Sequence, residues 1–234
     1  MIDWLQTSLS GSREHTIAPW AFWHARTLVL GWAILLPLGA LVARFFKVTA
    51  RQNWPTVLDS VFWWNGHRVL QYVGVLAISV GVALAWTNSG GATLAARLHA
   101  WAGWALLAAA WVQVAASWLR GSKGGPTDVN LRGDHYDMTP RRLVFERLHK
   151  SLGWLAVVVS IGVIVSGLLL VDAPRWMLLV LCIWWLGLAG AFALLQVKGR
   201  AVDTYQAIWG PDPAHPGNRR LPTGWGARRP LDKT

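Results

Sequence analysis

The sequence predicts an all-α fold, a multi-pass membrane helical bundle with five transmembrane helices. Hydrophobic residues make up 54% of the 234 residues and charged residues only 14%, whereas a soluble domain carries about 25% charged residues. A bilayer core needs roughly 17–25 apolar residues in a helix, and helices satisfy their own backbone hydrogen bonds in lipid. Five blocks contain no Asp, Glu, Lys or Arg: 27–43, 69–96, 98–119, 151–171 and 176–197.

Local signals place the ends of each helix. Pro19 suits the first turn of a helix, where its missing N–H is not needed, and Pro37 is expected to distort the same helix. Asn53-Trp54-Pro55 is a second start signal, while Ser89-Gly90-Gly91 and Ala173-Pro174 indicate short turns. The predicted helices are therefore 19–47, 53–86, 94–120, 140–172 and 175–198.

These elements divide the chain into three expected parts. Residues 1–18 form an outer polar tail, 19–200 a transmembrane domain, and 201–234 a cytoplasmic tail. The stretch 203–234 holds five Pro and four Gly without a periodic apolar pattern, so irregular structure is expected there.

The basic residues indicate a membrane topology. A net charge of +11 would favour nucleic acid in a soluble protein, but 18 of the 22 Lys and Arg fall on one predicted face of the membrane and four on the other. Because cytoplasmic loops are the basic ones, the N-terminus is expected outside and the C-terminus in the cytoplasm. We expect lipid and no nucleic acid as a partner.

Four histidines lie one each near the starts of four consecutive apolar helices: His24, His67, His99 and His149. Because successive helices start on alternate faces, His24 shares one face with His99, and His67 shares the other with His149. Ionisable side chains are costly in lipid and are mostly functional there. Two facing imidazoles near each surface are what two six-coordinate haems require.

A glycine follows each histidine at a helical spacing. Gly31 and Gly74 come seven residues after a histidine, and Gly103 and Gly153 come four residues after one. Both spacings return to the face of the histidine. A glycine there would leave room for a flat macrocycle, although small residues also help membrane helices to pack.

The donor set favours two haems b. Zinc and di-iron sites use more protein donors than two imidazoles. Cys182 is the only cysteine, which excludes cysteine-ligated iron–sulfur clusters and Cys-x-x-Cys-His attachment of haem c. Iron with two axial histidines has no open position, so electron transfer is favoured over oxygen activation. Twenty residues separate His24 from Arg44, which is about 30 Å of helix and predicts irons roughly 20–25 Å apart.

Haem propionates need cationic or hydrogen-bonding partners at each surface. Arg26 and Arg97 are the outer candidates, and Arg68, Arg147 and Lys150 are the inner ones. The alternative is that these side chains only border the membrane and extend to water.

Over about residues 22–171 the sequence resembles the cytochrome b561 superfamily. The resemblance is carried by Trp23-His24, Gly31-Trp32, Trp64-Asn65-Gly66-His67-Arg68, Leu98-His99 and Leu148-His149-Lys150-Ser151-Leu152-Gly153. It implies a four-helix core with two haems b, ligated axially by His24 with His99 and by His67 with His149. It also implies transmembrane electron transfer from a cytoplasmic reductant, often ascorbate, to an acceptor such as monodehydroascorbate or a ferric chelate.

We expect the chain to depart from typical eukaryotic members of that family in having five helices instead of six and no attached DOMON domain. It looks like a bacterial inner-membrane member, for which a quinol or another protein is an alternative donor. We therefore expect an electron carrier of the oxidoreductase type, and the sequence leaves open whether it is an enzyme, forms a homodimer or joins a larger complex.

Two other functions stay open. The chain is alternatively a haem-binding docking or structural subunit of a larger membrane redox complex, docking through the basic tail 198–234. Rapid reduction of the isolated chain by ascorbate or quinol would argue against that role. The other alternative is a small-solute transporter whose unliganded histidines relay protons, and such a protein would be colourless.

Overall fold

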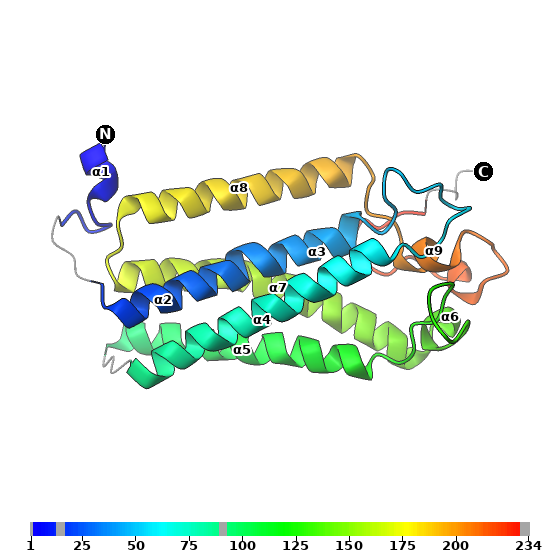
Figure 1. Cartoon of the computed structure of the whole chain (residues 1–234), viewed down its shortest axis with the longest axis horizontal. Coiled ribbons are helices and arrows are strands. Elements are labelled where there is room, and N and C mark those ends of the chain that lie inside the picture. The colour runs from blue at the N-terminus through cyan, green and yellow to red at the C-terminus, as the bar shows by residue number, and fades with distance from the viewer. Residues whose placement is uncertain (1, 13–16, 89–92, 230–234) are drawn as a thin grey trace. The chain divides into compact units, whose positions relative to one another are not determined.

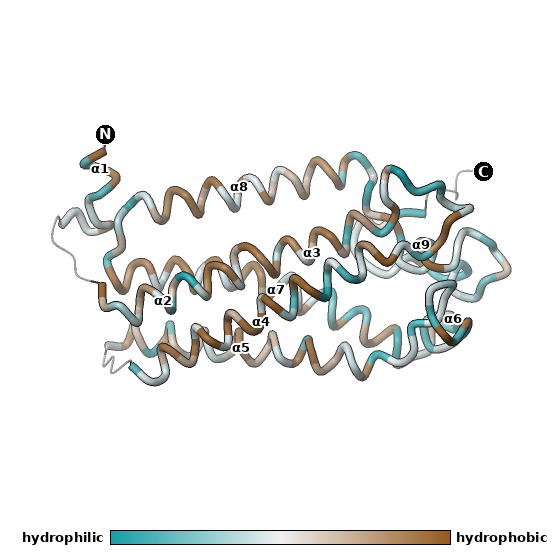
Figure 2. The backbone as a smooth tube through the Cα atoms, viewed as in Figure 1, coloured by the Kyte–Doolittle hydropathy of each residue, from teal (hydrophilic) through white to brown (hydrophobic). Residues whose placement is uncertain are grey.

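Five long helices, each apolar enough to cross a membrane, dominate the computed structural model, which describes residues 2–12, 17–88 and 93–229 (Figure 1). The first span, Pro19–Phe45, consists of α2 (Pro19–Leu28), the π-helical η1 (Val29–Leu35) and α3 (Leu36–Phe45). The other spans are α4 (Val61–Asn88), α5 (Leu94–Leu119), α7 (Pro140–Leu170) and α8 (Arg175–Val197). Figure 2 shows hydrophobic residues along these helices and hydrophilic ones mainly in the connections. The predicted all-α membrane bundle is confirmed.

The remaining elements are short. They are α1 (Ile2–Gln6), α6 (Asp134–Asp137), α9 (Thr204–Trp209) and the 3₁₀ turn η2 (Pro216–Arg219). Within the described residues there is no β-strand, and two isolated bridges join Ser8 to Pro174 and Val202 to Arg228.

Most of the predicted helix ends lie within two residues of the observed ones, but the predicted start of the second long helix is wrong. It begins at Val61, because the residues before it are held by tertiary contacts. Asp59 has a left-handed backbone with φ +51°, and its N–H donates to the carbonyl of Ala207 at 3.1 Å. Its carboxylate accepts from Lys123 Nζ at 2.6 Å and from the hydroxyl of Thr127. The predicted turn 89–91 lies outside the described residues.

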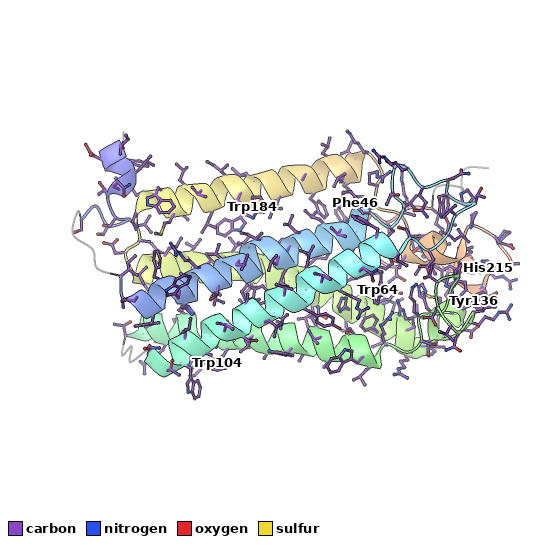
Figure 3. The ribbon with its side chains drawn as sticks, viewed as in Figure 1. Phe46, Trp64, Trp104, Tyr136, Trp184 and His215 are labelled. Atoms are coloured by element: carbon purple, nitrogen blue, oxygen red, sulfur yellow. The ribbon has the colours of Figure 1, made fainter. Side chains whose placement is uncertain are left out.

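The distortion expected at Pro37 takes the form of the π-helical segment η1, which ends just before it. Proline has no N–H, so it cannot donate to the carbonyl four residues earlier, which is that of Ala33. The indole N–H of Trp184 on α8, labelled in Figure 3, donates to this carbonyl at 2.7 Å. A tryptophan from another helix thus replaces the hydrogen bond that the proline cannot make.

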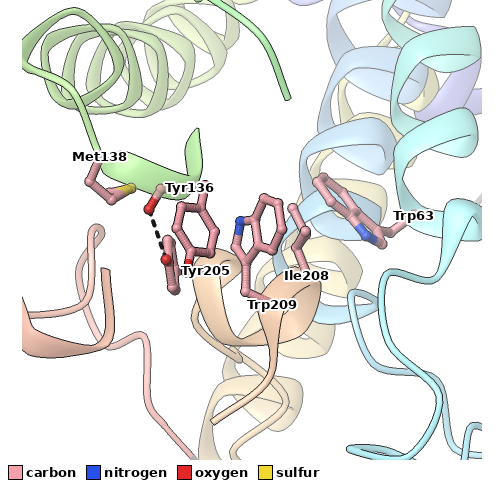
Figure 4. Packing of buried hydrophobic residues seen from close by; sticks show 6 residues of the cluster. All are labelled: Trp63, Tyr136, Met138, Tyr205, Ile208 and Trp209. Carbon is pink, nitrogen blue, oxygen red and sulfur yellow. Dashed lines mark hydrogen bonds between the residues drawn. The ribbon is translucent and has the colours of Figure 1, made fainter. Parts of the chain in front are cut away.

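The chain divides into two compact units. Unit 1 comprises residues 1–37, 71–111 and 154–190, and unit 2 comprises 38–70, 112–153 and 191–234. His24 and His99 belong to unit 1, whereas His67 and His149 belong to unit 2. The core of unit 1 includes Ala33, Leu168, Ala173 and Leu181. A largely aromatic core cluster in unit 2 contains Trp63, Tyr136, Met138, Tyr205, Ile208 and Trp209 (Figure 4).

The prediction of irregular structure throughout 203–234 is wrong for α9, whose six residues are all buried. The hydroxyl of Tyr205 donates to the carbonyl of Tyr136 at 2.8 Å, and Arg229 Nε donates to the carboxylate of Asp203 at 3.0 Å. A short helix buried on every side has no solvent-exposed face, so its sequence does not show the alternation of apolar and polar faces that reveals an amphipathic helix.

Candidate functional site

The first candidate site is a pair of imidazole rings in unit 1. The ring centroids of His24 on α2 and His99 on α5 lie 6.3 Å apart, with 71° between the ring planes. His24 Nδ1 lies 2.8 Å from the carbonyl oxygen of Gly81 on α4. A carbonyl can only accept, so Nδ1 carries the proton and Nε2 is the nitrogen available to a metal.

Close packing of α2 against α4 makes this hydrogen bond possible. A Cβ at Gly81 would overlap the side chains of Thr27 and Leu28 and lie 3.4 Å from the carbonyl oxygen of His24. The absence of a side chain at Gly81 therefore allows its carbonyl to reach the His24 ring. The sequence did not predict this acceptor. Every residue has a backbone carbonyl, so the residue type does not indicate which carbonyl accepts a hydrogen bond.

His99 is oriented by α7. Its Nδ1 lies 2.9 Å from Ser166 Oγ, and the Ser166 hydroxyl itself donates to the carbonyl of Val163 at 2.8 Å. Since the hydroxyl hydrogen is used on Val163, the hydroxyl oxygen accepts from His99 Nδ1–H. His99, like His24, therefore has Nε2 as its free ring nitrogen.

The second candidate site is the pair of rings in unit 2. The centroids of His67 on α4 and His149 on α7 lie 6.2 Å apart, with 79° between the planes. His67 Nδ1 donates to the carbonyl of Gly39 on α3 at 3.0 Å. His149 stacks on Phe145 at 5.0 Å between centroids, and its Nδ1 is buried without a hydrogen-bond partner.

Both pairs have the ring spacing that a shared metal ion requires. A metal–imidazole bond of about 2 Å on each side, plus the distance from nitrogen to ring centre, gives centroids about 6 Å apart. No group of three or more His, Cys, Asp or Glu suited to a metal occurs among the residues that the structure describes. Two protein donors per site fit a metal whose other ligands come from a macrocycle, and three of the four rings are already fixed by hydrogen bonds at Nδ1.

The predicted glycines divide into two kinds. A Cβ at Gly31 would lie 2.9 Å from the carbonyl oxygen of Gly74, and one at Gly74 would lie 2.9 Å from a methyl of Leu36, so close helix packing accounts for both. A Cβ at Gly103 would meet nothing within 4 Å, and one at Gly153 would lie 3.1 Å from Gln113 Nε2. Gly103 is thus the predicted glycine beside which the structure leaves room.

The predicted cationic residues are not equivalent. The Arg26 guanidinium lies 3.7 Å from the ring centroid of Phe22 on its own helix, and the Arg68 guanidinium lies 5.7 Å from the centroid of Trp64. Arg97 and Arg147 are exposed. Lys150 donates to the Glu146 carboxylate and to the carbonyl of Thr223, both at 2.8 Å.

A buried charged network in unit 2 was missed by the sequence analysis. The carboxylate of Glu146 accepts from Arg142 Nε at 3.0 Å and from Lys150 Nζ at 2.8 Å, and His135 Nε2 lies 3.5 Å from it. The spacing of Arg142, Glu146 and Lys150 at i, i+4 and i+8 was a readable signal for this network. The contact with His135 was not readable, because it depends on how loop 121–139 folds.

Two basic groups beside these charges, both outside the membrane-spanning helices, have altered acidity. Burial, followed by repulsion from Arg142, lowers the pKa of His135 to about 3, and the Trp209 indole donates to its Nδ1 at 3.2 Å. Burial, followed by repulsion from Lys150, lowers the pKa of Lys47 to about 7. Lys47 Nζ donates to the carbonyl of Val202 at 3.0 Å. His135 is therefore a neutral structural histidine at pH 7.

The structure has five helices apolar enough to cross a membrane and two pairs of neighbouring histidine rings. Comparisons with known proteins find distant relatives. The chain is 26% identical over 159 residues to a cytochrome b561, DM13 and DOMON domain-containing protein of Arabidopsis thaliana, a match covering 68% of this chain and 16% of the relative. It is 27% identical over 163 residues to ferric-chelate reductase 1 of Mus musculus, covering 69% and 24%. The human ferric-chelate reductase 1 is 23% identical over 145 residues, covering 62% and 22%.

The chain thus spans no more than about a quarter of the length of these relatives. No protein-family model and no solved structure matches it. The distant similarities support a cytochrome b561-like family.

Proposed function

We propose that this chain transfers electrons across a membrane through two haems b, one held by His24 and His99 and the other by His67 and His149. The observation that carries the proposal is the pair of ring spacings, 6.3 and 6.2 Å, within two compact units of one membrane protein. Haem b with two imidazole ligands supplies one-electron transfer without an open iron position.

The residues of the chain have three tasks in this proposal. The carbonyls of Gly81 and Gly39 and the hydroxyl of Ser166 accept from Nδ1–H of His24, His67 and His99, which fixes these three rings and presents Nε2. Gly103, beside which a Cβ would meet nothing within 4 Å, leaves space for the macrocycle. Arg26 and Arg97 on one face and Arg68 and Lys150 on the other are the proposed propionate partners, while the apolar helices exclude water.

The direction of transfer follows from the topology that we propose. With the N-terminus outside and the C-terminus in the cytoplasm, the His67–His149 pair lies on the cytoplasmic side and receives electrons from an ascorbate- or quinol-like reductant. The acceptor is on the other face, and the name of the ferric-chelate reductase relatives makes a ferric chelate a candidate. The proposed location is the bacterial inner membrane, with 19–200 as the electron-transfer domain and 201–234 as a cytoplasmic tail.

Haem content of the purified, detergent-solubilised chain tests the ligands. We expect two haems b per chain, a reduced b-type α band, and loss of one haem in each of His99→Ala and His67→Ala. His215→Ala, which removes a half-buried histidine outside both pairs, is the matched control and should keep both haems. Fewer than one haem per wild-type chain, or equal losses in the control, would contradict the proposal.

Transfer across a bilayer is tested in vesicles that contain ferricyanide and carry the protein in their membrane. Ascorbate or a water-soluble quinol added outside should reduce the trapped ferricyanide, and His67→Ala should abolish this reduction. A two-haem protein that neither donor reduces would favour the docking-subunit alternative.

A further inference from the structure

We propose that Ser166 is a positioning residue for His99 and sets the midpoint potential of the haem at the His24–His99 pair. The inference rests on the proposed function and goes beyond it, because it assigns control of one of the two haems to a single hydroxyl. Neither the sequence pattern nor the similarity to known proteins singles out this serine.

The direction of the hydrogen bonds carries the argument. Ser166 Oγ lies 2.8 Å from the carbonyl oxygen of Val163 and 2.9 Å from His99 Nδ1. The carbonyl can only accept, so the hydroxyl hydrogen points to Val163, one turn earlier on α7. The lone pairs of Ser166 Oγ are then available to His99, whose Nδ1–H must be the donor.

The residue after Ser166 holds the ring from a second direction. A Cβ on Gly167 would lie 3.0 Å from His99 Cε1, so the ring packs against the bare backbone of α7 at that point. Ser166 and Gly167 together fix both the tautomer and the position of His99 at the interface between α5 and α7.

A hydrogen bond that accepts Nδ1–H makes an imidazole a stronger donor to its metal. A stronger donor stabilises ferric iron more than ferrous iron and lowers the midpoint potential, because hydrogen bonding around the ligands is one of the means by which proteins tune haem. Removing the hydroxyl should therefore raise the potential of that haem.

Among the described residues, the Ser166 hydroxyl is the one side-chain group that accepts a hydrogen bond from Nδ1 of a ring in either pair. Within the described chain, His24 and His67 donate to backbone carbonyls, and His149 Nδ1 has no partner. A substitution of Ser166 can thus remove the hydroxyl acceptor at His99, while the backbone acceptors of His24 and His67 stay in place.

The test is a redox titration of the purified two-haem protein, monitored by absorption and by the ferric low-spin EPR signals. We expect Ser166→Ala to shift one of the two titration waves to higher potential, to change one EPR signal, and to leave the other wave in place. Ser166→Thr keeps a hydroxyl and should restore the wild-type wave.

Ser160→Ala is the matched control. Ser160 lies on the same helix, is buried, and donates to the carbonyl of Val157 three residues earlier, as Ser166 does to that of Val163. Ser160→Ala should leave both waves unmoved, which separates the hydrogen bond to His99 from the general effect of losing a hydroxyl on α7.

The outcomes separate the inference from the proposed function. A wild-type chain that binds no haem overturns both. A two-haem protein in which Ser166→Ala shifts neither wave, or shifts them no more than Ser160→Ala does, overturns only the inference. If Ser166→Ala loses one haem, retention of both in Ser166→Thr supports the positioning role, and an equal loss in Ser166→Thr refutes it.

Discussion

The two histidine pairs have almost the same ring spacing, but their surroundings differ. In unit 1 both rings donate to neutral acceptors, the carbonyl of Gly81 and the hydroxyl of Ser166. In unit 2 only His67 has such an acceptor, and Nδ1 of His149 is buried without one.

The two units also differ in the charged residues that they bury. The buried acidic, basic and histidine residues that the structure describes all belong to unit 2: Lys47, Asp59, His135, Arg142, Glu146 and Asp203. Unit 1 has only Ser8 and Ser160 among its described buried polar residues. The comparison teaches that the same spacing of two imidazoles occurs both in a unit without described buried charge and in a unit that contains a buried charged network.

The largest effect expected of a single substitution at neutral pH comes from breaking the charged network. Glu146→Gln removes the carboxylate that both Arg142 and Lys150 contact. Losing one partner of a buried ion pair leaves charge uncompensated, and we expect a loss of about 3 kcal/mol of stability. Thermal unfolding in detergent measures this loss, and haem retained at the His67–His149 pair should fall with it.

The neighbouring Arg147→Gln is the control for Glu146→Gln. Arg147 is exposed on the same helix, and a surface substitution of this kind changes stability by less than about 0.5 kcal/mol. Equal effects of the two variants would show that the charged network does not stabilise unit 2, and the contrast between the units would fail.

The second prediction concerns the loss of folding stability at acidic pH. The pKa of His135 is about 3 in the folded protein, against 6.5 for an ordinary histidine. Between these values the unfolded chain binds more protons, so stability is complete above pH 6.5 and falls as the pH drops toward 3, by about 1.4 kcal/mol per pH unit.

Unfolding free energies measured from pH 7 to pH 4 test this dependence. His135→Gln should flatten it, because an amide accepts from the Trp209 indole without titrating. An unchanged slope in His135→Gln would assign the acid sensitivity to other groups.

The third prediction addresses the neutral hydrogen bonds of unit 1. Trp184→Phe removes the donor to the carbonyl of Ala33, and an unpaired buried carbonyl costs about 1–3 kcal/mol. Pro37→Ala supplies an N–H four residues after Ala33, so in the Trp184→Phe background it should recover part of the loss. Strict additivity in the double-mutant cycle of unfolding free energies would contradict this account of the π-helical segment.

The part of this architecture that sequence could predict is the part set by composition and periodicity. Charge-free blocks predicted the five helices, and the alternating direction of membrane helices was enough to pair His24 with His99 and His67 with His149. The start of α4 was missed because the fold of the chain around Asp59 decides it. The acceptors on Gly81 and Gly39 were missed because a backbone carbonyl is the same in every residue.

The smallest effect is expected from a substitution at Gly103, close to the His24–His99 pair. It tests whether the macrocycle occupies the space beside this glycine. A Cβ at Gly103 or at Gly162 meets nothing within 4 Å, but Gly103 is half-buried and lies one turn after His99, whereas Gly162 is exposed. Both substitutions by alanine should raise the stability of the haem-free protein by about 0.5–1 kcal/mol, since glycine weakens a helix.

Only Gly103→Ala should weaken haem retention, by about 1 kcal/mol or roughly fivefold in affinity, because its methyl group would overpack an occupied space. Haem dissociation to an excess of apomyoglobin, measured for both alanine variants, compares them directly. If Gly103→Ala and Gly162→Ala release haem at the same rate, the space beside Gly103 is not used by the macrocycle. The glycine spacing would then reflect helix packing alone, as it does at Gly31 and Gly74, while the ligand role of the histidine pairs would be unaffected.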